Sequence, residues 1–294
     1  MSDAVFTGSA VAIVTPFSEA GVDYGKLEEL VEYHVAGKTD AIVACGTTGE
    51  ASTLSHEEHV AVVKCVVDAV AGRVPVIAGA GSNDTRYAVE LSEDLQNVGA
   101  SALLSVAPYY NKTSQRALVA HFTAIARSVT LPIILYNVPA RTVLNMNADT
   151  IREIAELPNV VGVKECNLSQ VGAIVTMCGE DFAVYSGDDA IILPVLSLGG
   201  KGVISTMANI IPEDTHDMVA RFLAGDVAGA RAIQLKAMNL ISALFVDVNP
   251  MPLKKAMNLM GMEVGTCRLP LVDVSDADAE VLARAMRDYG LIPA

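Results

Sequence analysis

Eight short apolar runs alternate with segments of helical periodicity along the first three quarters of the chain. Each run is rich in alanine and β-branched residues and has the length of a strand. Strands that are separated by helices pair in parallel, and a parallel sheet is buried on both faces. Eight such units predict a closed (β/α)8 TIM barrel, with an open doubly wound sheet as the alternative. The predicted strands are residues 9–15, 41–46, 74–78, 102–106, 132–137, 160–164, 183–186 and 202–205.

The segments between these strands have apolar residues at the spacing of amphipathic helices. Ser55 and Glu58 form the sequence signature of a capping box, which starts a helix that continues to about Val70. The other predicted helices are residues 26–33, 86–97, 115–128, 150–156, 168–178, 191–198 and 213–223.

From Asp226 onward the pattern changes, because three helical segments follow one another without a strand. These segments are residues 227–245, 250–260 and 276–289. We therefore predict a catalytic barrel in residues 1–225 and a small C-terminal helical domain in residues 226–294.

Composition excludes several classes of function. With 34 acidic and 20 basic residues, the formal net charge is −14, which argues against nucleic-acid and anionic membrane partners. No apolar run approaches the ~20 residues of a membrane span, and the N-terminus lacks the features of a secretory signal. Five scattered cysteines without a C-x-x-C pair indicate reduced thiols and a cytoplasmic protein.

Cofactor and metal motifs are incomplete. Gly79 and Gly81 follow an apolar strand, but Asp84 stands where the dinucleotide fingerprint has its third glycine. His56 and His59 share one helix face without an obvious carboxylate partner for a metal. We expect neither a metal nor a cofactor.

Lys164 ends the apolar strand 160–164. Burial disfavours an ammonium ion, so the pKa of such a lysine falls and a neutral, nucleophilic amine becomes available. Schiff-base chemistry needs an amine of this kind. The alternative is a structural lysine whose ammonium group reaches solvent along its flexible stem.

Other polar side chains follow the remaining strands, and in a barrel all of these strand ends meet on one face. Thr47 and Thr48 follow the second strand, whereas Tyr136 and Arg141 stand at the end of the fifth. Each of them alone has an ordinary structural explanation. Together with Lys164 they suit an α-keto acid, because hydroxyls can bind its carboxylate, the amine its carbonyl, and a phenol can move protons.

Six segments, all in the same order along the chain, resemble the 4-hydroxy-tetrahydrodipicolinate synthase (dihydrodipicolinate synthase) family. They are 46–50 (GTTGE), 108–111 (PYYN), 136–142 (YNVPART), 162–165 (GVKE), 186–189 (SGDD) and 202–205 (GVIS). The resemblance implies a class I aldolase-type lyase that condenses pyruvate with L-aspartate 4-semialdehyde in lysine and diaminopimelate biosynthesis. It also implies a homotetramer built from two tight dimers.

The same resemblance implies roles for individual residues. Lys164 is expected to form the imine with pyruvate, and Tyr136 to move protons at the imine. Thr47 and Tyr110 are expected to be its relay partners, with Tyr110 supplied by a neighbouring subunit. The substrate-binding residues are expected to be Thr48, Arg141, Ile204 and Gly187, with Arg141 holding the carboxylate of the semialdehyde.

Relatives that are inhibited by lysine have an allosteric pocket, and the resemblance assigns six residues here to it. Five match positions that line it, namely Leu54, His56, His59, Asn83 and Tyr109, and the sixth is Ser52, which stands in an Ala51–Ser52 pair where the more usual order is Ser–Ala. Tyr87, however, stands where inhibited relatives have a glutamate. Since the two amines of lysine need anionic or carbonyl partners, we expect weak or absent inhibition by lysine.

One segment departs from the family. Cys166, Asn167 and Leu168 follow Glu165, where the family usually has a small, glycine-containing run. A sister activity such as N-acetylneuraminate lyase or a keto-deoxy-sugar aldolase is the alternative function, although those relatives typically lack the Thr47–Thr48 pair and Arg141. A catalytically silent binding barrel is the alternative of a different class.

Overall fold

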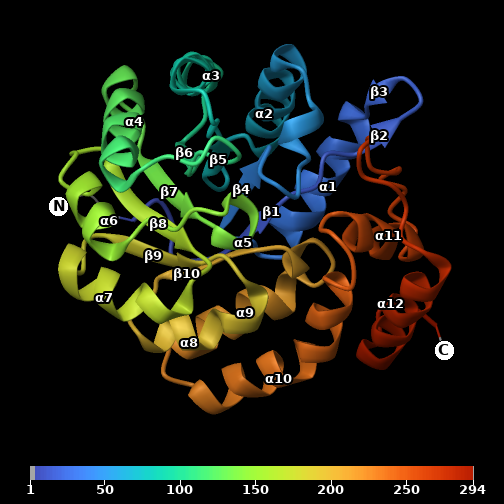
Figure 1. Cartoon of the computed structure of the whole chain (residues 1–294). Coiled ribbons are helices and arrows are strands. Elements are labelled where there is room, and N and C mark those ends of the chain that lie inside the picture. Colours follow the sequence, from blue (N-terminus) through green and yellow to red (C-terminus); the bar gives the residue numbers. More distant parts are fainter. Residues whose placement is uncertain (1–3, 294) are drawn as a thin grey trace.

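The computed structural model describes residues 4–293 and shows a closed barrel of eight parallel strands. The last strand pairs with the first, with Gly8 opposite Gly202 (Figure 1). The closed barrel confirms the predicted fold class. The strands are β1 (Gly8–Ala12), β4 (Ala41–Ala44), β5 (Val76–Gly79), β6 (Ala102–Val106), β7 (Ile133–Asn137), β8 (Val160–Glu165), β9 (Ala183–Ser186) and β10 (Gly202–Ser205).

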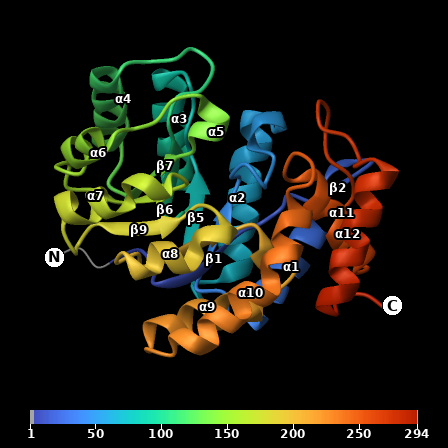
Figure 2. The same cartoon turned by 60° about the horizontal axis from the view of Figure 1, so that its bottom comes forward.

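Helices surround the barrel, as Figure 2 shows from a second direction. The predicted capping box is confirmed, since Glu58 N donates to Ser55 Oγ and Ser55 N donates to the Glu58 carboxylate. The barrel helices are α1 (Tyr24–Ala36), α2 (His56–Val70), α3 (Thr85–Asn97), α4 (Gln115–Ser128), α6 (Ala148–Ile154), α7 (Leu168–Cys178), α8 (Ile192–Ser197) and α9 (Pro212–Leu223).

Two strand predictions extend too far. β1 ends at Ala12 rather than at residue 15, and β4 ends at Ala44 rather than at residue 46. The second difference has a clear cause, because Cys45 has a φ of 54° and a strand cannot continue through a left-handed residue. The sequence patterns also missed the small hairpin β2 (Phe17–Ser18) and β3 (Gly21–Val22) and the one-turn helix α5 (Pro139–Thr142).

The C-terminal segment is helical, as the sequence indicates. It contains α10 (Val227–Leu244), α11 (Met251–Leu259) and α12 (Asp276–Tyr289). Leu240, Leu282 and Met286 belong to the same buried hydrophobic cluster as side chains between the barrel strands and their helices. The division into two domains at residue 226 stays a prediction.

The N-terminal end of the barrel is closed by aromatic side chains. The ring of Phe6 stacks on Tyr185 at 4.3 Å between centroids, and the Tyr185 hydroxyl donates to Phe6 O at 2.8 Å. Above them, small side chains such as Ala10 and Ala41 fill the interior. Polar side chains can therefore converge at the opposite end, where the strands have their carboxyl ends. No helix within residues 4–293 has the length and apolarity that crossing a membrane requires.

Candidate active site

Lys164 lies near the carboxyl end of β8 with only 7% of its surface exposed. Its Nζ lies 4.4 Å from the centroid of the Tyr136 ring on the neighbouring strand β7. Burial lowers the pKa of Lys164, and the positive charge of Arg141 lowers it further, whereas Cys166 and Asp189 act in the opposite direction. The site therefore favours a neutral amine, which is the nucleophilic form.

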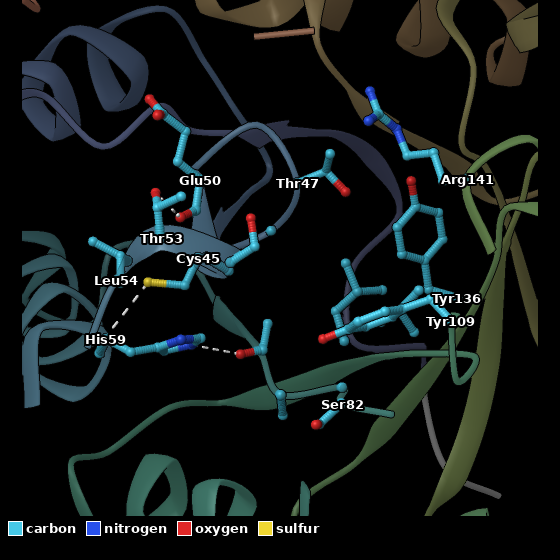
Figure 3. Close-up of a pocket in the computed structure, with 18 of the residues that line it drawn as sticks. Cys45, Thr47, Glu50, Thr53, Leu54, His59, Ser82, Tyr109, Tyr136 and Arg141 are labelled. Carbon is cyan, nitrogen blue, oxygen red and sulfur yellow. Dashed lines mark hydrogen bonds between the residues drawn. The ribbon is translucent and has the colours of Figure 1, made fainter. Parts of the chain in front are cut away.

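Tyr136 is equally buried, and burial raises the pKa of its phenol well above the usual value. Cys166 raises this pKa as well, while the charge of Arg141 and a hydrogen bond with Thr47 lower it. The side chain of Thr47, in the loop after β4, is directed toward the Tyr136 hydroxyl, and Arg141 of α5 lies beside the same phenol (Figure 3). The phenol thus stays protonated at neutral pH and has a hydroxyl partner with which it can exchange a proton.

Thr47 and Thr48 belong to a tight loop after β4. Cys45 and Glu50, at its two ends, both have a φ of 54°, a conformation that non-glycine residues adopt rarely. Thr15 Oγ1 donates to Gly49 O at 2.7 Å, and a Cβ on Gly49 would lie 3.1 Å from Cys45 N. The loop is therefore held in one shape by close backbone packing.

Arg141 lies in α5, and its Nη2 donates to Asn249 O at 3.2 Å. The side-chain amide of the same asparagine donates to Thr48 Oγ1 at 3.0 Å. Asn249 Oδ1 is buried and has no hydrogen-bond partner among the described residues. Sequence reasoning missed Asn249, because it lies far from any strand end and no local pattern marks it.

Two expected pyruvate-binding positions lie at the last two strands and are not part of the lining of the large cavity that Tyr136 lines. Ile204 is buried on β10, and Gly187 follows β9. A Cβ on Gly187 would overlap Cys166 Sγ and come within 3.2 Å of Lys164 Cε, so a larger residue here would displace these side chains. The segment that departs from the family pattern therefore brings the thiol of Cys166 close to Lys164. The sequence alone did not predict this contact.

Asp189 is a buried carboxyl group near Lys164 to which sequence reasoning assigned no role. Its Oδ2 accepts hydrogen bonds from Thr206 N at 3.1 Å and Met207 N at 2.8 Å. Burial raises the pKa of Asp189 to about 6, although the Ser205 hydroxyl, the Met207 backbone N–H and the charge of Lys164 act against the rise. When ionised, Asp189 is an anionic neighbour for a cation on Lys164.

A cavity of about 530 Å³ opens beside these side chains (Figure 3). Thr47, Tyr136, Arg141 and Asn249 line it. Lys164 itself is not part of the lining. Its amine lies against the ring of Tyr136, and Tyr136 does line the cavity. A volume of this size accommodates small organic molecules. Residues 4–293 contain no group of three or more His, Cys, Asp and Glu side chains that could hold a metal ion.

Residues 5–288 match the Dihydrodipicolinate synthetase family. The chain belongs to this family. It is 57% identical to the 4-hydroxy-tetrahydrodipicolinate synthase of Acetivibrio thermocellus, over 99% of this chain and 100% of that protein. It is 48% identical to the enzyme of the same name from Clostridium perfringens, over 98% and 100% of the two chains.

Solved structures of dihydrodipicolinate synthases have the same fold. The Aquifex aeolicus structure superposes with a TM-score of 0.95 at 44% identity, covering 97% of this chain and 99% of that one. The Acinetobacter baumannii structure, complexed with pyruvate, gives the same TM-score, identity and coverage. The Cyanidioschyzon merolae structure, with lysine bound, has a TM-score of 0.95 at 43% identity, covering 98% and 99%.

Tyr110 is not brought to the cavity of its own chain. Its side chain is 90% exposed, with a φ of 71°, at the tip of the loop after β6. The neighbouring Tyr109 is 38% exposed and lines the cavity. In this structure Tyr110 therefore does not line the cavity beside Tyr136 of its own chain, and its expected contribution from another subunit stays a prediction.

The residues expected to bind an effector are only partly together. Ser52, Leu54, His59 and Tyr109 line the same cavity as the Thr47, Tyr136 and Arg141 set. Asn83 lines a different pocket of about 300 Å³ together with His121. Tyr87 also lines the large cavity, and its ring meets His56 edge-on at 5.8 Å between centroids.

The two histidines of this set are engaged within the chain. His59 Nε2 donates to Gly79 O at 2.8 Å, and burial lowers the pKa of His59 to about 4, so its ring is neutral. His56 Nε2 lies 3.0 Å from Asp94 Oδ2. Both rings thus have partners within the chain, and an imidazole, neutral or cationic, does not replace the glutamate carboxylate of inhibited relatives.

Proposed function

We propose that this chain is a 4-hydroxy-tetrahydrodipicolinate synthase that condenses pyruvate with L-aspartate 4-semialdehyde in lysine and diaminopimelate biosynthesis. The observation that carries the proposal is the buried amine of Lys164, held 4.4 Å from the ring centroid of a protonated Tyr136. Family membership and the pyruvate complex of the Acinetobacter baumannii relative support it.

The reaction begins with attack of the Lys164 amine on the carbonyl carbon of pyruvate. Loss of the carbonyl oxygen as water requires protons, which Tyr136 delivers through its contact with Thr47. The resulting imine withdraws electrons from the methyl group of pyruvate, so that a proton leaves and an enamine forms.

The enamine carbon then attacks the aldehyde of the semialdehyde and forms the new carbon–carbon bond. The aldehyde oxygen takes up a proton and becomes the hydroxyl group of the product. The amino group of the semialdehyde next attacks the imine carbon, which closes the ring and releases Lys164 for another turnover.

Binding is divided between two groups of residues. The Thr48 hydroxyl and the backbone at Gly187 and Ile204 hold the pyruvate moiety close to Lys164. The guanidinium of Arg141, which lines the cavity, holds the carboxylate of the semialdehyde through charge-assisted hydrogen bonds. No cofactor takes part in this scheme.

The exposed Tyr110 supports an assembly in which one subunit completes the relay of another. The proposal is a homotetramer of two tight dimers, with Tyr110 of each subunit reaching the Tyr136 of its dimer partner. The scattered cysteines are free thiols among the described residues, in keeping with the reducing cytoplasm as the place of action.

The experiment that tests this function is turnover of purified protein with pyruvate and L-aspartate 4-semialdehyde. Cleavage of N-acetylneuraminate is measured beside it on the same preparation. Condensation without cleavage is expected. Cleavage of N-acetylneuraminate without condensation would assign the site to the sister activity instead.

A further inference from the structure

A buried ion pair connects the Thr47–Thr48 loop to the C-terminal helices. Lys254 Nζ on α11 lies 2.6 Å from Glu50 Oε1, and the two side chains are only 2% and 1% exposed. Glu50 is the last residue of the loop, and its side chain points away from Thr47 and Tyr136 (Figure 3). Glu50 borders the cavity that Thr47 and Tyr136 line, but its carboxylate is paired with Lys254 rather than with the reacting groups.

Both members of the pair are fixed by additional contacts. Arg268 N donates to Glu50 Oε2 at 2.9 Å, and Lys254 Nζ donates to Thr266 O at 3.1 Å. The Lys254 ammonium also lies over the Phe17 ring, 4.2 Å from its centroid. The carboxylate thus has a charged partner and a backbone donor in fixed positions.

The loop itself explains why such an anchor is needed. Glu50 has a φ of 54°, which is unfavourable for a residue with a Cβ and persists only when surrounding contacts enforce it. Helix α11 contacts Glu50 through Lys254. Asn249, two residues before this helix, contacts the loop a second time, since its Nδ2 donates to Thr48 Oγ1 at 3.0 Å.

We propose that the Glu50–Lys254 ion pair holds the loop in the conformation that aligns Thr47 with Tyr136 and Thr48 with pyruvate. Glu50 and Lys254 are then positioning residues of the reaction, and the C-terminal segment is part of the catalytic apparatus. This inference rests on the proposed function, because it assigns the loop its part in the condensation.

The decisive variant is Lys254→Met, which keeps the length of the side chain but leaves the Glu50 carboxylate buried without its cation. An unpaired buried charge is strongly unfavourable, so Glu50 turns toward solvent and moves the loop. Misplacement of Thr47 should lower kcat about ten- to hundredfold. Glu50→Gln in the Lys254→Met background removes the unpaired charge and should restore most of this loss.

The matched control is Lys255→Met, which removes the next lysine of the same helix, a less buried one. Active sites are counted by borohydride trapping of pyruvate on Lys164, and kcat is expressed per trapped site. A purely structural role would reduce the number of sites and leave kcat per site unchanged. Such a result in Lys254→Met, or equal losses in Lys255→Met, would overturn the proposal.

Two further measurements keep the test decisive. Amide hydrogen exchange of residues 45–54 should accelerate in Lys254→Met and not in Lys255→Met, whatever reaction the protein catalyses. Unchanged exchange would refute the anchor, whereas a wild-type protein without turnover would refute the proposed function alone. If Lys254→Met does not fold, the single variant Glu50→Gln replaces it. This variant should show the same loss of kcat per site and the same faster hydrogen exchange of residues 45–54. A wild-type value for either measurement contradicts the inference.

Discussion

Replacing Arg141 by alanine should impair the use of L-aspartate 4-semialdehyde much more than the binding of pyruvate. Arg141 lines the cavity, and among residues 4–293 it makes one hydrogen bond, from Nη2 to Asn249 O at 3.2 Å. Its remaining donors are thus available to a substrate carboxylate. Loss of a charge-assisted interaction costs about 1.5–3 kcal/mol. That corresponds to a roughly ten- to hundredfold lower kcat/KM for the semialdehyde.

The same substitution has a second effect, on the pH profile. The charge of Arg141 lowers the pKa of Lys164, so its removal raises that pKa. Only the neutral amine attacks pyruvate, and a higher pKa leaves less of it at a given pH. The acid limb of the profile for imine formation should therefore move to higher pH in Arg141→Ala.

The assay measures kcat/KM for each substrate and, separately, the rate of borohydride trapping of pyruvate across pH. Arg152→Ala is the matched control, because the side chain of Arg152 is exposed and its one ion pair among the described residues is with the exposed Glu156. Equal losses for both substrates, together with an unmoved acid limb, would show that Arg141 has a structural role and would refute this reasoning.

Three further outcomes are expected. Tyr136→Phe should lower kcat by about 10²–10⁴-fold, because general acid–base catalysis contributes that much, while borohydride still traps pyruvate slowly on Lys164. Near-normal turnover would contradict the role of Tyr136 in proton transfer. Mixing Lys164→Ala subunits with Tyr110→Phe subunits should restore part of the activity, and verified hybrids without rescue would place Tyr110 outside the site. Lysine should inhibit the wild type weakly. Tyr87→Glu should tighten inhibition by lysine about tenfold or more, because a charged hydrogen bond is gained. Sub-millimolar inhibition of the wild type would show that another group replaces the glutamate carboxylate of inhibited relatives.

The strands of the barrel could be predicted because their burial leaves a local mark in the sequence. The run 102–106 coincides with β6, and the lysine at the end of the run 160–164 lies buried beside Tyr136, as expected. Fully buried parallel strands are continuous apolar runs, and polar residues directly after them stand out. The positions of most candidate residues at one end of the barrel follow from this rule alone.

What the sequence did not predict depends on contacts between distant segments. Asn249 reaches Thr48 across 201 positions of the chain, and Lys254 reaches Glu50 across more than 200. Cys45 adopts a left-handed conformation that its residue type does not suggest. Such features arise from tertiary packing, which overrides local preference and has no periodic signature.

The measurement that tests the central claim most directly is reduction with borohydride in the presence of pyruvate, followed by peptide mapping. The account predicts one reduced pyruvate adduct per chain, on Lys164, with loss of activity in proportion to labelling and no labelling of a Lys164→Met variant. An adduct on a different lysine, or inactivation without any adduct, would contradict it.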